Sequence, residues 1–260
     1  MSKQPTLILC ELTDPGIDGL ESYSPFCLKA HRALRAAGLR YESRHGDAPH
    51  AFKRLNPTGQ VPVLLVDGEP VADSTAILQR IDALTGALTR GLDAGQRAEA
   101  WLWEELADSA LNGFLVSARW ADERNWLRVR ECYFGAAPWF VQRIVAPRLR
   151  KQVVGAMVAR DVWRRGAEAC WARFQTTLDQ LEARAPQRGF WLNDAVTVAD
   201  VALFAQLHSL RTPLTPVQRE QLAARARLCA YLDRVDAATR SRQPSSSASA
   251  AARGAGVAHA

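Results

Sequence analysis

The sequence of 260 residues lacks the features that mark several large classes of protein. No apolar run approaches the length of a membrane-spanning helix. We expect no secretory signal, because residues 2–5 lead directly into an apolar strand. The five cysteines are an odd number without framework spacing, which predicts reduced thiols and a cytoplasmic protein. No His/Cys cluster has zinc spacing, no glycine-rich phosphate loop occurs and no Ser/His/Asp order stands out, so we expect no metal and none of those enzyme classes.

What the sequence does contain is ample material for a core, since hydrophobic residues make up 48% of it. That suffices for one large or two moderate domains. Residues 5–86 predict strand–helix–strand, a loop with a short helix near 51–55, and then strand–strand–helix. Residues 87–92 are the predicted linker, and every strong pattern in residues 93–240 is helical. Residues 241–260, rich in Ser, Ala and Gly, are predicted to be disordered.

The segment Tyr23-Ser24-Pro25-Phe26-Cys27 lies where a strand is predicted to give way to a helix. Ser24 fits the N-cap and Pro25 the first helical position. The Ser24 hydroxyl would then lie among unpaired N–H groups at the positive end of the helix dipole. A thiolate brought to that point would be stabilised, as would the thiolate of Cys27. The same residues also suit a plain helix cap and a small buried side chain, so the segments that follow decide between the two interpretations.

Two later segments add features of a ligand site. Residues 56–62 form a loop before two strands, predicted at residues 63–66 and 69–72 and joined by a tight Asp-Gly turn. Asp73 or Ser74 can cap the next helix. Free N–H groups and a hydroxyl at that helix start would suit a carboxylate ligand.

Taken together, these segments resemble the glutathione transferase family. A Ser-Pro-Phe-Cys helix start, a Gly-Gln-Val-Pro-Val loop and an Asp-Ser pair before a helix occur in order at fitting separations. The resemblance implies an α/β thioredoxin-like N-terminal domain followed by an all-α helical C-terminal domain, a homodimer, and glutathione as co-substrate. The glutathione-binding residues that it implies are Lys53, Gln60, Val61, Pro62, Asp73 and Ser74, with Pro62 in the cis form.

The resemblance places Ser24 where some branches of the family carry a catalytic Ser and others a Cys. Tyr23 and Cys27 are the other residues that could contact the sulfur. A hydrogen bond from Ser24 would favour the thiolate, which would attack a small aromatic or apolar electrophile. Glutaredoxin relatives carry Cys at that first position, so Ser24 argues against thiol–disulfide chemistry and leaves Cys27 as the only thiol in the motif. A glutathione-dependent thiol reductase acting through Cys27 is the alternative enzyme.

In the second half of the chain, Thr197 and Asp200 form a capping pattern before an apolar helix predicted at residues 201–207. In transferases this motif organises the helical domain. Residues 163–181 place apolar side chains on one stripe, which predicts a core face. Residues 222–235 fit one further helix.

Residues 124–165 form a basic insert, with ten Arg or Lys residues against two acidic ones, in a chain whose net charge is +6. Aromatic residues are interleaved, namely Trp126, Tyr133, Phe134, Trp139, Phe140 and Trp163. The insert could be a solvated helical hairpin, part of an electrophile pocket, or a surface for acidic membranes or proteins. Without a nucleic-acid-reading motif, we expect no nucleic-acid partner. Here the chain looks loosely similar to the branch containing metaxins and failed-axon-connections proteins, so a non-catalytic binding module is the main alternative to an enzyme.

Overall fold

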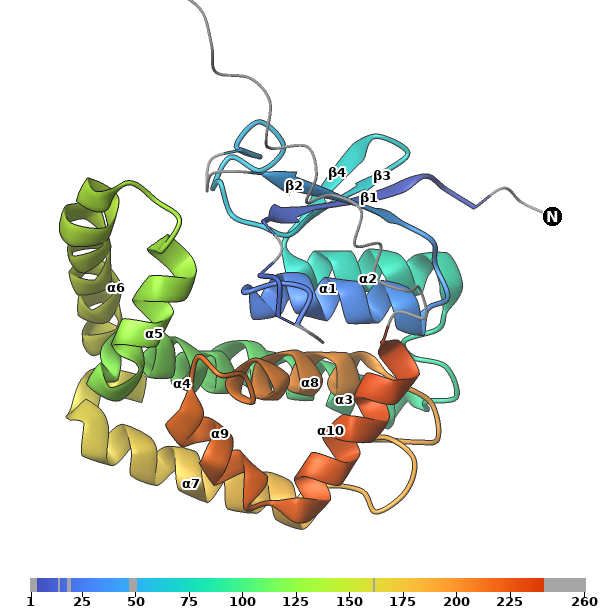
Figure 1. The fold of residues 1–260 in the computed structure, drawn as a ribbon. Helices are drawn as coiled ribbons and strands as arrows, with labels where there is room; N and C mark the ends of the chain where they lie inside the picture. The colour runs from blue at the N-terminus through green and yellow to red at the C-terminus, as the bar shows by residue number, and fades with distance from the viewer. Residues whose placement is uncertain (1–3, 14, 18–19, 47–50, 161, 241–260) are drawn as a thin grey trace, which may run out of the picture.

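The computed structural model describes residues 4–13, 15–17, 20–46, 51–160 and 162–240. A sheet lies on one side of the molecule, helices cover one of its faces, and most of the remaining helices lie beyond them, while residues 123–160 stand at one side (Figure 1). This arrangement confirms the predicted α/β region followed by a helical one. The predicted disorder of residues 241–260 lies outside the described residues.

Within the described residues, four strands form one mixed sheet in the order β2-β1-β3-β4. Their bounds are β1 Leu7–Leu12, β2 Glu42–Gly46, β3 Val63–Val66 and β4 Glu69–Ala72. β1 pairs with β2 in parallel, whereas the β1–β3 and β3–β4 pairs are antiparallel. The predicted Asp-Gly turn joins β3 to β4, and both Asp67 and Gly68 have the positive φ that such a hairpin turn needs.

Helices α1 (Pro25–Ala36) and α2 (Ser74–Thr85) cover one face of the sheet (Figure 1). Both begin where the sequence predicts, because a local side chain caps each of them. The Ser24 hydroxyl accepts a hydrogen bond from the Cys27 N–H at 3.3 Å. The predicted short helix at 51–55 is wrong, since those residues form turns in which Phe52 O accepts from both Leu55 N and Asn56 N. The following proline disfavours helical geometry at Asn56 and prevents a second turn.

The helical region begins at α3, after Gly86 has ended α2 in the left-handed conformation. Its elements are α3 (Ala94–Leu106), η1 (Ala107–Leu111), α4 (Asn112–Val116), η2 (Ser117–Ala121), α5 (Glu123–Phe134), η3 (Val141–Val145), α6 (Ala146–Arg160), η4 (Val162–Arg165), α7 (Gly166–Arg184), α8 (Val198–Leu210), α9 (Pro216–Ala223) and α10 (Ala226–Thr239). The segments η1, η2 and η3 are π-helical turns and η4 is a 3-10 turn. The domain limits at 86/87 and 92/93 remain predictions.

Helix α8 is the central element of the helical region and packs against both α1 and α3. Its predicted capping motif is confirmed: Asp200 accepts from Thr197 N at 2.8 Å and from Thr197 Oγ1 at 2.7 Å. The second carboxylate oxygen of Asp200 accepts from Trp191 N and from the Tyr231 hydroxyl, both at 2.7 Å. A buried carboxylate with this many donors is satisfied, so Asp200 fixes the start of α8.

Two helical predictions need correction. Residues 222–235 belong to two helices, α9 and α10, and not to one. The sequence contains no Gly or Pro at this break, so its pattern gives no sign of it. In the predicted core stripe, Cys170, Phe174 and residues 178 and 181 are buried, but Ala167 is exposed and Trp163 lies in η4 before α7 begins.

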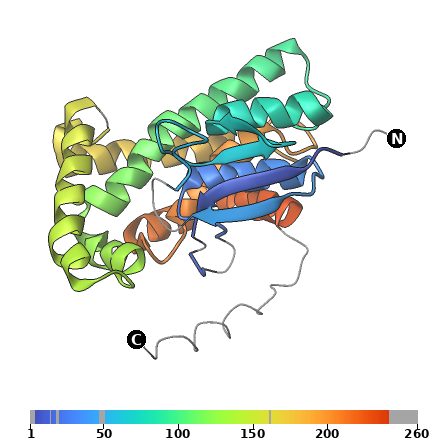
Figure 2. The same cartoon turned by 90° about the horizontal axis from the view of Figure 1, so that it is seen from above.

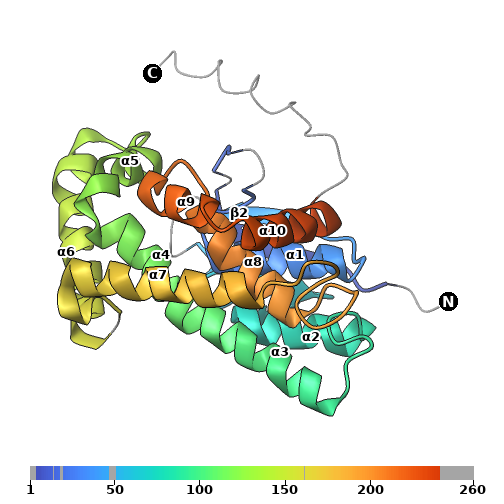
Figure 3. The same ribbon diagram turned by 90° about the horizontal axis from the view of Figure 1, so that it is seen from below.

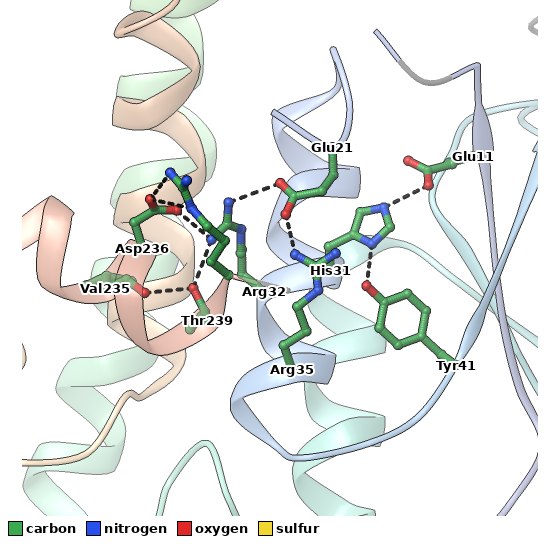
Figure 4. A network of polar contacts seen from close by, with 10 residues as sticks. Glu11, Glu21, His31, Arg32, Arg35, Tyr41, Val235, Asp236 and Thr239 are labelled. Carbon is green, nitrogen blue, oxygen red and sulfur yellow. Dashed lines mark hydrogen bonds and ion pairs between the residues drawn. The ribbon is translucent and has the colours of Figure 1, made fainter. Parts of the chain in front are cut away.

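A buried arginine joins α1 to α10 (Figure 4). Arg32 is 0% exposed and donates to Asp236 Oδ1 at 2.7 Å, to Thr239 Oγ1 at 3.3 Å and to Glu21 Oε2 at 3.1 Å. Its guanidinium also lies 4.7 Å from the ring centroid of Phe204 on α8. Because one buried cation holds groups from three parts of the chain, it fixes α1 on the helical region.

Candidate functional site

A cleft of about 420 Å³ opens at the junction of the sheet region and the helical region. Its walls come from the start of α1, the loop before β3, the start of α2 and the end of α3 with η1. The lining residues are Phe26, Asn56, Thr58, Gln60, Val61, Pro62, Ala72, Asp73, Ser74, Thr75, Glu105 and Asp108. The structure therefore brings together five of the residues that the sequence assigns to glutathione: Gln60, Val61, Pro62, Asp73 and Ser74.

The loop before β3 is held by one asparagine. Asn56 Nδ2 donates to Gln60 O at 2.9 Å, while Asn56 Oδ1 accepts from Thr58 N at 3.2 Å and from Thr58 Oγ1 at 2.9 Å. The Val61–Pro62 peptide bond is cis, as the family resemblance implies. With both ends of the loop fixed in this way, the backbone of Val61 forms a defined edge of the cleft.

Asp73 has an unusual backbone at the start of α2, with φ 80° and ψ 133°. Its carboxylate turns back over the helix and accepts from Thr75 N at 2.8 Å and from Ala76 N at 3.1 Å. Asp73 therefore occupies two of the N–H groups that the sequence offers to a carboxylate ligand, and Ser74 remains on the wall of the cleft. Strain of this kind at a non-glycine residue is concentrated at functional sites. Ser74 is 5% exposed and presents its side of α2 to the cleft.

The other predicted site residues lie outside the cleft lining. Lys53 is exposed in the turn after residue 50, so no lysine or arginine lines the cleft as described. Tyr23 packs edge-on against Tyr133, with ring centroids 4.9 Å apart, and its hydroxyl donates to Pro15 O at 3.5 Å. Ser24 is half-buried and caps α1 two residues before Phe26, which does line the cleft.

Cys27 corrects one expectation from the sequence. Its thiol is 0% exposed, and burial together with the nearby Glu11 carboxylate raises its pKa to about 12, although hydrogen bonds with Ser24 and Ser22 lower it. The helix start therefore does not make Cys27 a thiolate at neutral pH. A buried neutral thiol is a poor nucleophile, which weakens the interpretation as a thiol reductase.

Beneath the cleft lies a buried charge cluster that the sequence did not indicate. Lys29 on α1 is 0% exposed and donates to Glu104 Oε1 at 2.7 Å and to Asp108 Oδ2. Glu104 also accepts from Thr75 Oγ1 at 2.5 Å, which connects the cluster to the start of α2. Burial raises the pKa of Asp108 to about 6, although Lys29 opposes that rise. The cluster puts a carboxyl group that titrates near neutral pH on the wall of the cleft.

The cleft is thus acidic, with Asp73, Glu105 and Asp108 among its lining residues. Such a wall can bind an ammonium or hydroxyl group of a ligand, while the Ser74 and Thr75 side chains can bind polar atoms. Glu105 and Asp108 could not be identified from the sequence, because they lie in a helical pattern with no cap or motif. Asn56 and Thr58 lie in the loop that the sequence did single out.

The basic insert contributes no residue to this cleft. A second cavity, of about 380 Å³, lies at the junction of η4 and α7 and is lined by Val162, Arg164, Arg165, Ala169 and Arg173. In the part of the chain that the structure describes, no group of three or more His, Cys, Asp or Glu side chains is arranged to hold a metal ion. Among the same residues, no helix combines the length and apolar character needed to cross a bilayer.

Comparison with known families matches two models along the chain. Residues 25–125 match the glutathione S-transferase N-terminal domain, and residues 161–234 match the glutathione S-transferase C-terminal domain. These limits differ from the predicted domain limits, because the first match extends across the linker into α5. The N-terminal match contains the start of α1, the cis-proline loop and the start of α2, which are the parts that form the cleft.

The individual relatives include a metaxin, a plant glutathione transferase and, among solved structures, a beta-etherase. Human metaxin-2 is 22% identical over 187 residues, covering 70% of each chain, which confirms the similarity to the branch containing metaxins. Glutathione transferase GST 23 of Zea mays is 37% identical over 98 residues, covering 35% of this chain and 44% of its own. Among solved structures, the beta-etherase LigF of Sphingobium sp. strain SYK-6 superposes with a TM-score of 0.62 at 24% identity, covering 89% of this chain and 95% of its own. Since both halves of the chain match family models and the fold matches a solved transferase-like structure, the chain belongs to the glutathione S-transferase family.

Proposed function

We propose that this protein is a glutathione transferase that activates the thiol of glutathione for attack on a small aromatic or apolar electrophile. The observation that carries the proposal is the cleft, in which a cis-proline loop and the start of α2 face each other. Family membership supports it, because glutathione transferases use glutathione as co-substrate. The maize relative gives further support, since its match lies within a transferase.

Glutathione would bind through the loop and the start of α2. The Val61 backbone would hold the cysteinyl part, and Asp73 with Ser74 would hold the γ-glutamyl end. The Ser74 hydroxyl lines the cleft and no hydrogen bond within the described residues engages it, which leaves it available to a ligand. Neither Lys53 nor Ser24 is among the lining residues, so Lys53 would reach the glycine carboxylate, and Ser24 the sulfur, from beside the cleft.

Ser24 would be the activating residue. Its oxygen already accepts from the Cys27 N–H, so its own proton remains available for donation, either to Cys27 Sγ or to a bound sulfur. Donation to the glutathione sulfur favours the thiolate over the thiol and lowers the thiol pKa. Each unit of that shift corresponds to about 1.4 kcal/mol between the two protonation states.

The test uses four variants, two of them assayed for turnover with an aryl chloride activated by nitro groups and two for glutathione binding. Ser24→Ala should lower turnover by roughly ten-fold to a thousand-fold, as for the loss of a hydrogen-bond donor to a developing anion. Cys27→Ala should retain most of the activity, because that thiol is buried. Ser74→Ala should weaken glutathione binding, measured by calorimetry. Asp73→Asn removes the charge of residue 73 but keeps a side-chain oxygen that can cap α2, so weaker binding in this variant is due to the lost charge. Full activity in Ser24→Ala together with loss of activity in Cys27→Ala would contradict the assignment.

A non-catalytic module is the second candidate, and two observations favour it. The similarity to metaxin-2 extends over 70% of the chain, and the cleft lacks a basic side chain for the glycine carboxylate. Retention on immobilised glutathione with specific elution distinguishes the two candidates. Failure to bind glutathione at any accessible concentration would favour the module.

We also propose a homodimer in the cytoplasm. The dimer is supported by family membership, with the sheet region of one subunit packing on the helical region of the other around a two-fold axis. The cytoplasmic location is supported by the five cysteines, none of which is paired in a disulfide bond among the described residues. Analytical sedimentation measures the mass of the assembly, and a mass equal to that of one chain would contradict the dimer.

A further inference from the structure

An exposed apolar surface extends from the two residues before η3 through η3 to the first turn of α6, and it is independent of the proposed catalysis. Trp139 is 70% exposed and Phe140 is 47% exposed. Three more large apolar side chains of this segment are exposed, namely Ile144, Val145 and Leu149. We call residues 138–151 the outer segment. A cluster of this kind on a soluble domain marks an interaction surface.

The exposed side chains are not core residues that failed to pack, because the inner side of α6 is already in contact with α5 and η2. Ala146 is buried with Trp126 and Val129 in a small separate core. Arg150 donates to Trp120 O at 2.7 Å and pairs with Glu123 at 2.8 Å. Its guanidinium also lies 4.7 Å from the ring centroid of Trp126. The helix is therefore anchored on one side and leaves its other side to solvent.

The outer side is also strongly basic. Residues 135–159 contain four basic side chains and no acidic one. Arg150 is engaged on the inner side, whereas Arg143, Arg148 and Lys151 are exposed. Exposed aromatic and aliphatic side chains next to exposed Arg and Lys supply the two contributions that bind a protein to an anionic membrane interface, namely apolar burial and attraction to lipid phosphates.

The position of the outer segment in the molecule distinguishes a membrane from a second copy of the chain as its partner. Helix α6 lies at the edge of the molecule in the side view (Figure 1) and in the views from above and below (Figure 2 and Figure 3). A single helix at an edge can lie flat on a bilayer. A two-fold contact centred on this patch would bring Arg143, Arg148 and Lys151 of both copies together, which is repulsive. We propose that the outer segment docks the protein on an anionic lipid bilayer, with Trp139 and Phe140 in the interface and the three exposed cations at the lipid phosphates.

The test is co-sedimentation of the full chain with vesicles of phosphatidylcholine, alone or mixed with phosphatidylglycerol. We expect binding to the anionic vesicles only, falling as salt rises, because exposed charges are screened. The triple variant Arg143→Gln/Arg148→Gln/Lys151→Gln should bind on the order of a hundred-fold more weakly. Trp139→Ser/Phe140→Ser should lose roughly ten-fold through the apolar contribution. Arg150 is excluded from these variants because of its role in anchoring α6.

A charge-matched control is available on other exposed surfaces. Arg80→Gln/Arg90→Gln/Arg219→Gln removes the same net charge and should bind anionic vesicles as the wild type does. Thermal melting and glutathione affinity confirm that each variant is folded. Absence of binding to anionic vesicles at low salt, or equal loss in the control, overturns the proposal. The proposal is also overturned if Trp139→Ser/Phe140→Ser has a lower sedimentation mass than the wild type but binds vesicles equally well. The outer segment would then join two copies of the chain.

Discussion

Two buried cations lie three residues apart on α1, and both connect the sheet region to the helices, but their surroundings differ in charge. Arg32 lies among acids that are matched by further cations, since Arg35 also pairs with Glu21 and Arg240 also pairs with Asp236. Glu104 and Asp108, in contrast, share Lys29, and among the described residues no second cation forms an ion pair with either of them. The first cluster lies away from the cleft, and the second forms part of its wall.

The pKa values follow this difference. Burial alone would raise the pKa of Glu21, but the two neighbouring guanidinium groups hold it below its ordinary value. Burial likewise opposes ionisation of Asp236, yet hydrogen bonds and charge from Arg240 and Arg32 lower its pKa. For Asp108 burial prevails, and the pKa rises to about 6. A balanced cluster stabilises the fold, whereas an unbalanced one keeps a carboxyl group near its titration point, which is typical of functional sites.

Removing the balanced cation should have the largest effect. Arg32→Met leaves Asp236 and Glu21 without their buried partner and should cost about 3 kcal/mol of unfolding free energy, measured by urea denaturation. A matched control is Arg211→Met, because the Arg211–Asp233 pair has the same 2.7 Å separation as the Arg32–Asp236 pair but lies at the surface. The control should cost below about 1 kcal/mol. Equal losses in both variants would remove the distinction between buried and exposed pairs.

Neutralising Asp108, one of the two carboxylates that share Lys29, should alter how the free energy of unfolding depends on pH. Because the pKa of Asp108 is raised in the folded state, folding favours its protonated form, and its contribution to stability falls as pH rises from about 4 to about 6. Asp108→Asn removes this fall. The stability of the variant relative to wild type should therefore improve by about 2 kcal/mol between pH 4 and pH 7.

Glu105→Gln is the control for that experiment, because Glu105 lines the same cleft but is exposed. Its stability relative to wild type should change little over the same range. Glu21 and Asp236 act in the opposite direction in all variants, since acids with lowered pKa lose their stabilising effect as pH falls. If the stability of Asp108→Asn depends on pH as that of the wild type does, folding does not raise the pKa of Asp108 to about 6.

The smallest expected effect concerns the link from the acidic cluster to α2. Thr75→Val removes the hydrogen bond to Glu104 while keeping the shape of the side chain, and should cost about 1 kcal/mol. Thr75→Ser keeps a hydroxyl and should recover most of that loss. Thermal melting with both variants measures the difference. A neutral Thr75→Val would show that Lys29 alone satisfies Glu104.

The sequence predicted best where structure is decided by neighbours in the chain. The caps at Ser24, Asp73 and Thr197 each depend on residues within one helical turn, and each was found. The partners of Lys29 lie 75 and 79 residues away, and no local pattern specifies them. Arg150 was counted as one more surface charge because its contacts with Trp120 and Glu123 arise only when α6 packs on α5.

The same limit explains the site residues. Gln60 to Pro62 and Asp73 to Ser74 belong to short motifs, so the sequence assigned them to one site and the cleft contains them. Glu105 and Asp108 reach the cleft only because α3 crosses the start of α2, which is a tertiary event. The buried state of Cys27 is likewise a property of packing, and a helix start alone cannot decide it.

Helices α3 and α4 form one continuous rod over residues 94–121, interrupted by the π-helical turns η1 and η2. These turns change how the chain aligns with its relatives. Asn112 N–H donates to Ala107 O and Asp122 N–H to Ser117 O, each spanning one residue more than an α-helical bond. An extra residue rotates all later side chains by about 100° relative to an uninterrupted α-helix. A helical wheel drawn over the whole rod therefore mixes faces, and must be restarted after residue 111. Any relative without these wide turns needs a one-residue gap at each, and Asp108 should be compared only with residues placed by that gapped alignment.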